Sequence, residues 1–198
     1  GQGYDYSFGH MGGCIDNYSH FFYWSGPNRH DLWRNGREVH YDGAFFGDLM
    51  TEECKRFIDH NRKRPFFLYW AINMPHYPLQ GLEKFRERYK DLPEPRNHYA
   101  AFVSTVDDMV GRVIKTVNKL GLREDTVIIY FSTHGARCSD ENGDEADEHD
   151  EFLVVHDSDI ENLDTIRDTV LMDDMFGRWL QVLDGRKLIV LLDTCHSA

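Results

Sequence analysis

Three short, mainly apolar segments divide the chain, at residues 66–72, 126–132 and 187–193. Each segment is short and is followed by polar or turn-forming residues, a pattern typical of a strand that is buried on both faces. The intervals between the segments are long enough to hold helices. Strands that alternate with helices predict an α/β fold with a mainly parallel sheet and flanking helices.

Helical periodicity is clearest over residues 98–120, where apolar side chains recur every three or four positions and form one buried face. Gly121 follows, as is common after the last residue of a helix. Two shorter helices are predicted over residues 47–62 and 173–183. Residues 1–45 are rich in Gly, Asn, Tyr, His and Trp, and are expected to form loops with short irregular elements.

The formal net charge of the 198-residue chain is -12. This charge argues against nucleic acid as a main partner, because phosphate binding needs clustered Lys and Arg. Residues 1–135 contain as many basic as acidic side chains, so the whole excess of acid follows them. This change in charge balance suggests a boundary near residues 130–135 and an acidic loop over residues 136–151. No apolar run approaches the ~20 residues that a membrane-spanning helix needs.

Six motifs follow one another through the first two-thirds of the chain: Gly3-Tyr4-Asp5-Tyr6-Ser7-Phe8-Gly9, Gly12-Gly13-Cys14-Ile15-Asp16-Asn17-Tyr18-Ser19-His20, Pro65-Phe66-Phe67-Leu68-Tyr69, Pro75-His76-Tyr77-Pro78-Leu79-Gln80, Asp107-Asp108-Met109-Val110-Gly111-Arg112-Val113 and Gly121-Leu122-Arg123-Glu124-Asp125-Thr126-Val127-Ile128-Ile129. Their order and spacing resemble the later part of a sulfatase catalytic domain, within the alkaline-phosphatase-like superfamily. The resemblance covers residues 1–131.

This resemblance implies hydrolysis of a sulfate ester by a formylglycine nucleophile, with a divalent cation that is usually calcium. A hard cation and cationic side chains would neutralise the sulfate oxygens during the attack. His76 matches the family's His in a Pro-His-x-Pro loop, which contacts the sulfate and can assist the leaving group. Without the resemblance, His76 would be interpreted as an ordinary polar loop residue.

Two parts of the family's site are missing from the sequence. The nucleophile motif C-x-P-x-R and the early metal carboxylates do not occur, and are expected before Gly1. The late metal motif reads Ser132-Thr133-His134-Gly135, with Thr133 where the family has a metal-binding Asp. A hydroxyl cannot supply that charge, so the chain alone is expected to have no sulfatase activity.

Residues 127–198 carry a second set of motifs. One apolar strand ends in His134-Gly135, and another leads into Asp193-Thr194-Cys195-His196-Ser197-Ala198. The succession resembles the caspase family, in particular the metacaspases (peptidase C14-type). The resemblance implies that Cys195 is a nucleophile and His134 its general acid/base, with backbone N–H groups of Gly135 and Cys195 as an oxyanion hole. The other three cysteines are expected to be small buried hydrophobic residues.

The chemistry of a thiol nucleophile agrees with this pairing. A free thiol is mostly protonated at neutral pH, so a base must lie near it. His134 and Cys195 each follow a predicted strand. Because the carboxyl ends of parallel strands share one edge of a sheet, the two side chains are expected to lie side by side.

Four acidic residues have roles only through the caspase resemblance. Asp193 matches the primary specificity pocket, which implies a peptide substrate with Arg or Lys before the cleaved bond. The alternative is a strand-end carboxylate that caps local N–H groups. Asp150, Asp173 and Asp174 match positions that bind activating calcium in metacaspases. A solvated acidic face with a helix-capping Asp is an equal alternative.

The sequence therefore predicts an α/β hydrolase built from an incomplete sulfatase-like segment, 1–131, and an incomplete caspase-like segment, 127–198. The main interpretation is a cysteine peptidase, because only that nucleophile and base are both present. One alternative is a sulfatase-family piece, acting on a sulfate ester, whose formylglycine and metal site lie outside this chain. Another is a catalytically inactive fragment.

Overall fold

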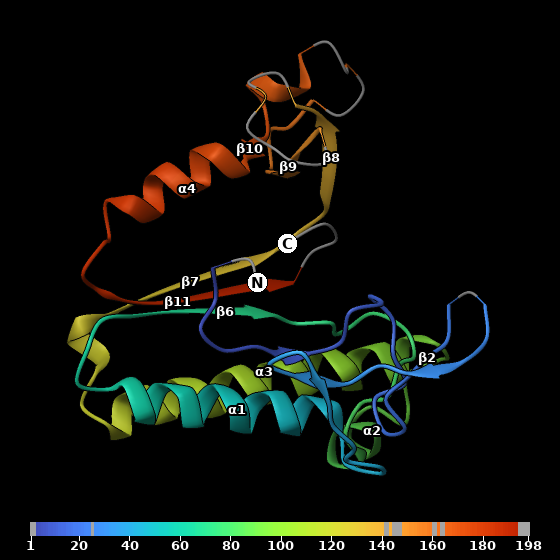
Figure 1. The fold of residues 1–198 in the computed structure, drawn as a ribbon. Helices are drawn as coiled ribbons and strands as arrows, with labels where there is room; N and C mark the ends of the chain where they lie inside the picture. The colour runs from blue at the N-terminus through green and yellow to red at the C-terminus, as the bar shows by residue number, and fades with distance from the viewer. Residues whose placement is uncertain are drawn as a thin grey trace. The chain divides into compact units, whose positions relative to one another are not determined.

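The computed structural model describes residues 3–24, 26–140, 143, 148–159, 162 and 165–193. The chain forms two compact units that interleave along the sequence (Figure 1). The first unit comprises residues 1–63 and 73–124, and the second comprises residues 64–72 and 125–198.

The second unit is built on a three-stranded sheet. Its strands are β6 (Phe66–Ala71), β7 (Thr126–Ser132) and β11 (Lys187–Asp193). Both pairings are parallel, and the order is β6-β11-β7, so the strand that comes last in the sequence lies in the middle (Figure 1). The predicted strands and the parallel sheet are therefore confirmed.

Strand β11 is apolar from Leu188 to Leu192, where it is buried. The five side chains from Leu188 to Leu192 are all buried. Leu188, Val190 and Leu192 belong to a core cluster that also receives apolar side chains of helix α4 (Asp173–Gln181). The predicted helix over residues 173–183 is confirmed, and its packing against the cluster explains its apolar positions.

A second, antiparallel sheet in this unit differs from the sequence prediction. It contains β10 (Leu171–Met172), β9 (His149–Leu153) and β8 (Gly135–Ser139), in that order. Residues 136–151 were expected to form an acidic loop, but both of their ends lie in strands. The many charged positions mask the alternation, in which Ala136 and Cys138 pack against a cluster that contains Phe152. A short 3-10 helix, Ile166–Asp168, precedes β10.

Residues 1–45 were predicted to form loops with short irregular elements, and the structure places short paired strands among these loops. Strands β1 (Phe8–Gly9), β4 (Trp33–Arg34) and β5 (Arg37–Glu38) pair in the order β1-β4-β5. Strand β2 (Phe21–Phe22) pairs with β3 (Arg29–His30) in a separate antiparallel hairpin.

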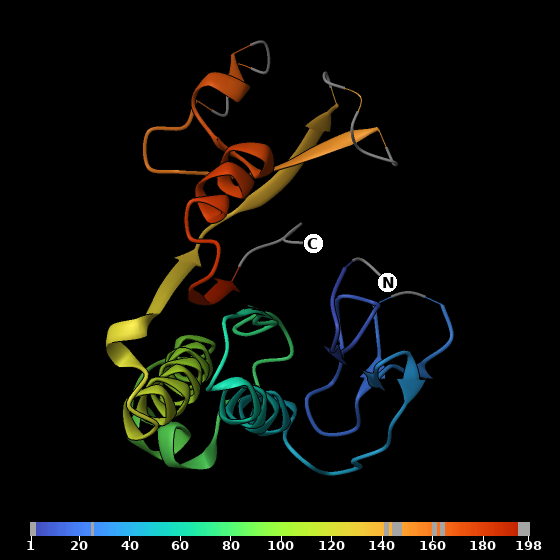
Figure 2. The same cartoon turned by 60° about the vertical axis from the view of Figure 1, so that its left-hand side comes forward.

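The first unit also contains the helices α1 (Phe46–Asn61), α2 (Glu83–Arg88) and α3 (Arg96–Lys119). A 3-10 turn at Arg123–Asp125 spans the sequence boundary with the second unit. Helices α1 and α3 match the two predicted helices and lie side by side (Figure 2). The Nη2 of Arg112 lies 2.6 Å from Oδ1 of Asp48, which joins the two helices. Among the described residues, no helix combines the length and apolar character needed to cross a membrane.

Candidate functional site

The loop that carries His76 lies in the first unit, between two prolines. The His76 side chain is exposed, and its Nδ1 lies 3.0 Å from the carbonyl oxygen of Tyr77. The ring of Trp24, itself 70% exposed, has its centroid 6.5 Å from that of His76. An exposed imidazole beside an exposed indole can contact a ligand directly.

Three hydrogen bonds hold this loop to the segment around Asp16. The Nε2 of Gln80 donates to Asp16 Oδ2 at 2.6 Å, and Gln80 Oε1 accepts the Asn17 N–H at 2.9 Å. The hydroxyl of Tyr23 donates to the Tyr77 carbonyl. Two motifs of the sequence, more than 60 residues apart, are thus joined through the side chain of Gln80.

The Asp16 carboxylate is arranged to stay ionised. Burial alone would raise its pKa, but hydrogen bonds from Ser19, Gln80 and Tyr18 outweigh burial and hold the pKa below its ordinary value. The N–H groups of Ser19 and Tyr18 lie 2.8 and 3.0 Å from Asp16 Oδ1. The anchor of the His76 loop therefore keeps its charge at neutral pH.

Gly81, directly after the loop, gives a first testable prediction. A Cβ at Gly81 would come 2.8 Å from the carbonyl carbon of Ala101 and from the nitrogen of Phe102, both in the backbone of α3. Because backbone cannot move aside as a side-chain tip can, Gly81→Ala is expected to lower the free energy of unfolding by about 1–3 kcal/mol. Urea denaturation followed by circular dichroism measures this change.

Gly111→Ala is the matched control, because a Cβ at Gly111 in α3 meets no atom within 4 Å. This substitution is expected to raise the stability by up to about 1 kcal/mol, since Ala favours a helix interior over Gly. Equal midpoints for Gly81→Ala and the unsubstituted chain would contradict the close approach.

Asp31 organises the Gly12-Gly13 motif. Its carboxylate, on a residue only 3% exposed, accepts N–H groups from Gly12 at 2.6 Å and Met11 at 3.2 Å, and the Trp33 Nε1–H at 2.7 Å. A Cβ at Gly12 would lie 2.5 Å from the ring of Phe22, which explains why glycine stands there. Burial alone would raise the pKa of Asp31, but these hydrogen bonds hold it below its ordinary value.

His134 lies between β7 and β8, with an exposed side chain. Its carbonyl accepts the Val154 N–H at 2.8 Å, and the Thr133 hydroxyl donates to the Val154 carbonyl at 2.5 Å. Ser132 at the end of β7 pairs in parallel register with Asp193 at the end of β11, so these two strand ends do share one edge. Cys195 and the side chain of Asp193 lie outside the described residues, and Gly135 begins β8.

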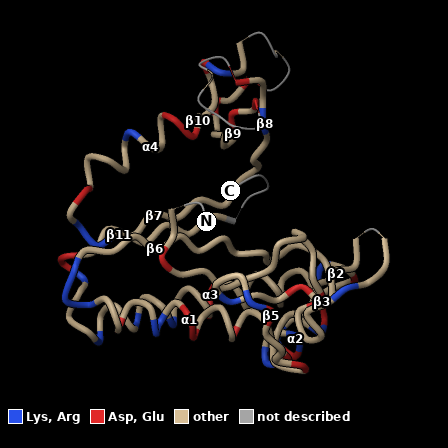
Figure 3. Tube along the Cα trace, in the orientation of Figure 1, with Lys and Arg blue, Asp and Glu red and all other residues tan. Residues whose placement is uncertain are grey.

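The three carboxylates considered for calcium belong to β9 and to the start of α4, and Figure 3 shows acidic residues near both elements. Asp150 is buried, and its Oδ2 lies 2.7 Å from Nη2 of Arg167, which already neutralises it. Burial raises the pKa of Asp173, and the charges of Asp150 and Asp174 act in the same direction. Within the described part of the chain, these carboxylates do not converge as a set of metal ligands.

Among the described residues, Cys14, Cys54 and Cys138 form no disulfide. Cys54 is buried on α1, as expected of a small hydrophobic residue, and burial raises its pKa to about 12. A thiol with that pKa is unreactive at neutral pH. Cys14 and Cys138 are partly exposed, so the expectation of burial is wrong for these two.

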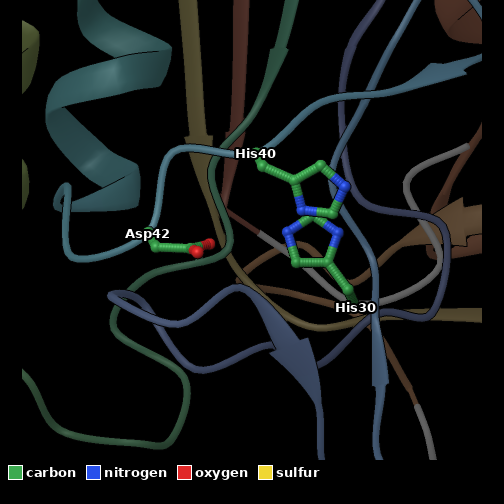
Figure 4. Close-up of side chains that lie close together, drawn as sticks. All are labelled: His30, His40 and Asp42. Carbon is green, nitrogen blue, oxygen red and sulfur yellow. The ribbon is translucent and has the colours of Figure 1, made fainter.

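One further group of side chains has no role predicted from the sequence. His30, His40 and Asp42 come together in the first unit although their segments are separate in the sequence (Figure 4). The available signal was the local richness in His. These histidines do not have the spacing of a known metal-binding motif. The pairing of two-residue strands cannot be derived from hydrophobic periodicity.

This chain is similar to known sulfatases. The family model described as Sulfatase matches residues 1–185. Mouse arylsulfatase J is 30% identical over 141 residues, which are 69% of this chain and 24% of that protein. An endo-4-O-sulfatase from Bacteroides thetaiotaomicron is 28% identical over 166 residues, 72% of this chain and 32% of that protein. The solved structure of Ps i-CgsB has a TM-score of 0.42 and 34% identity, covering 46% of this chain and 21% of that one.

The prediction of a caspase-like cysteine peptidase is wrong. The sulfatase match continues well past residue 131 and includes His134, Gly135 and all three carboxylates proposed for calcium. A hydrophobic strand that ends in a polar turn and Gly occurs in many parallel α/β proteins, so it reports the fold and not the chemistry. The peptide substrate, and the role of Asp193 in selecting Arg or Lys, had no other basis than that resemblance.

The similarity to these two relatives agrees with the sulfatase-like motifs of the first two-thirds of the chain. The chain spans about a quarter to a third of the length of each relative. The mixed α/β architecture with a parallel sheet agrees as well. The chain belongs to the sulfatase family.

Proposed function

We propose that this chain is part of a sulfuric ester hydrolase and that it supplies the loop whose histidine, His76, contacts the sulfate or the leaving group. The observation that carries the proposal is the exposed imidazole on a loop that Gln80 fastens to Asp16 and Asn17. An imidazole can donate a proton to the departing oxygen, which would otherwise leave as an unstable alkoxide. The hydrogen-bonded loop would hold that group in position without reorganisation.

A shallow groove beside the same loop supports a role in substrate binding. It has a volume of about 350 Å³ and is lined by loop residues Pro75, Tyr77 and Leu79, and by Arg96 and Tyr99 of α3. A guanidinium is suited to sulfate oxygens because it presents parallel N–H donors, and Tyr offers an apolar face with a polar tip. We assign this groove to the part of the substrate that carries the ester.

Nucleophile and cation are assigned to residues outside this chain. The family's C-x-P-x-R motif does not occur in the sequence. The residues at the late metal motif do not fit calcium, because the Thr133 hydroxyl donates to the Val154 carbonyl and brings no charge. No step through formylglycine or calcium is therefore derived for these residues.

The experiment compares the 198-residue chain with the protein encoded by its whole reading frame. Release of inorganic sulfate is measured on aryl sulfates and sulfated oligosaccharides in the presence of calcium. The chain alone is expected to show no turnover, and the whole protein is expected to hydrolyse at least one ester. His76→Ala in the whole protein is expected to lower kcat about 100-fold, within the range for loss of a general acid.

His60→Ala is the control, because His60 is an exposed histidine in the last turn of α1. It is expected to leave turnover unchanged. Unchanged kcat in His76→Ala would refute the role of this histidine. Turnover by the 198-residue chain would refute the assignment of the nucleophile to other residues.

A further inference from the structure

Three side chains of the first unit lie close enough to share a metal ion. His30 is the last residue of β3, and His40 and Asp42 lie in the segment that follows β5. One ligand atom from each of the three lies within 4.8 Å of the other two. Figure 4 shows the Asp42 carboxylate directed toward the stacked rings of His30 and His40, whose centroids are 4.2 Å apart.

The His30 side chain carries a second, independent sign of a ligand. It is only 7% exposed, and its Nε2 is buried without a hydrogen-bond partner. A buried polar atom that lacks a partner costs about 1–3 kcal/mol, so native proteins rarely leave one unmatched. The other nitrogen, Nδ1, lies 2.8 Å from Oε1 of Glu38.

The contact with Glu38 determines which nitrogen of His30 is available. When Nδ1–H donates to the Glu38 carboxylate, the proton is held on Nδ1, and Nε2 presents its lone pair. A carboxylate that accepts from the far nitrogen of a histidine is the usual outer partner of a metal-bound imidazole, since it fixes the tautomer and raises the basicity of the ligand. The unmatched Nε2 and the Glu38 contact therefore have one common explanation.

We propose that His30, His40 and Asp42 bind a zinc ion, with Glu38 as a positioning residue. Two imidazoles and one carboxylate form a donor set typical of zinc, which binds nitrogen and oxygen at about 2.0–2.2 Å and leaves a fourth position for water. Calcium prefers six or more oxygen ligands, so this set discriminates against the cation usual in sulfatases. None of these residues belongs to the His76 loop, to which the sulfate chemistry is assigned.

Two of the ligands are free to close on the ion. His40 and Asp42 are exposed, whereas the buried His30 is held by Glu38. Rotation of the His40 and Asp42 side chains would shorten the distances between the three ligand atoms to those found around a tetrahedral zinc ion. Bound zinc would fasten β3 to the segment after β5, in a part of the chain that has only two-residue strands.

The test uses the 198-residue chain and zinc chloride alone. Isothermal titration calorimetry is expected to show one zinc ion bound per chain, with micromolar affinity. His40→Ala and Asp42→Asn are each expected to weaken binding at least 10-fold, and Glu38→Gln about 10- to 100-fold. The spectrum of the cobalt-loaded chain is expected to show the visible bands of a tetrahedral site, and to lose them in His40→Ala.

His60→Ala serves as the control here too, because it removes an exposed histidine of α1 that lies outside the cluster. Circular dichroism verifies that every variant is folded, which the exposure of residues 40 and 42 favours. Absence of zinc binding, equal weakening by His60→Ala and His40→Ala, or a calcium affinity equal to that for zinc would each overturn the proposal. Because no sulfate ester is used, a failed hydrolysis assay has no bearing on this result.

Discussion

Val190→Asp is expected to unfold the second unit of the chain. Val190 is 1% exposed and lies on the central strand β11, in register with Tyr69 on one side and Ile129 on the other. Its side chain belongs to an apolar cluster with Leu153 and Leu171. A carboxylate placed there has no cation to pair with, and burial of an unpaired charge costs several kcal/mol.

The cost of burying this carboxylate is a large part of the 5–15 kcal/mol that typically separates a folded domain from its unfolded state. We expect a loss of at least about 4 kcal/mol, seen as a urea midpoint shifted strongly toward zero denaturant or as the absence of a cooperative transition. Val182→Asp is the matched control, because Val182 follows α4 and is 84% exposed. It is expected to change stability by less than about 0.5 kcal/mol. A folded Val190→Asp chain would refute the central position of β11.

Asp31→Ala is expected to lower the free energy of unfolding by about 3 kcal/mol or more. The substitution removes the acceptor of three donors, the N–H groups of Met11 and Gly12 and the indole N–H of Trp33. The Asp31 side chain is buried and its donors are partly buried, and a buried donor left without a partner costs about 1–3 kcal/mol. Asp5→Ala is the control, because Asp5 lies in the same unit and is exposed. Equal midpoints for both variants would contradict the network.

The effect of Asp31 also depends on pH, with a sign fixed by the direction of its pKa. The folded state holds this pKa below its ordinary value, so folding favours the ionised form. The stabilisation is fully present above the pKa of an unfolded Asp, about 3.9, and is lost as the pH falls from there through the folded-state pKa. The difference in urea midpoint between Asp31→Ala and the unsubstituted chain should therefore stay constant from pH 7 to about pH 5 and narrow as the pH falls below about 3.9.

The strands of the parallel sheet could be predicted from the sequence because each is buried along its length. Residues 126–132 and 187–193 were predicted to the residue, since polar or charged residues bound an apolar run in each strand. The hairpin of β8 and β9 could not be predicted, because charged side chains fill its exposed positions and resemble a solvated loop. The order β6-β11-β7 also lies beyond periodicity, which carries no information on strand neighbours.

Residues of the candidate site were predicted from the sequence only where they belong to a recognised motif. His76 and Gln80 were found because both belong to one sulfatase-like segment, although their hydrogen-bond partners were not apparent from the sequence. His30, His40 and Asp42 were missed, because the turns that bring them together are set by tertiary contacts. His134 was misassigned to a peptidase, because a polar residue and a glycine after a buried strand fit several kinds of enzyme equally well.

The position of β11 between β6 and β7 constrains how the polypeptide acquires its structure during synthesis. Residue 187 pairs with residue 66, so roughly 120 residues must leave the ribosome between these partners. Until then β6 and β7 have unpaired edges, which are prone to association with other chains. Contacts between residues this distant along the chain form slowly. Nascent chains paused before residue 187 should therefore require a chaperone, whereas the helices of the first unit can already form.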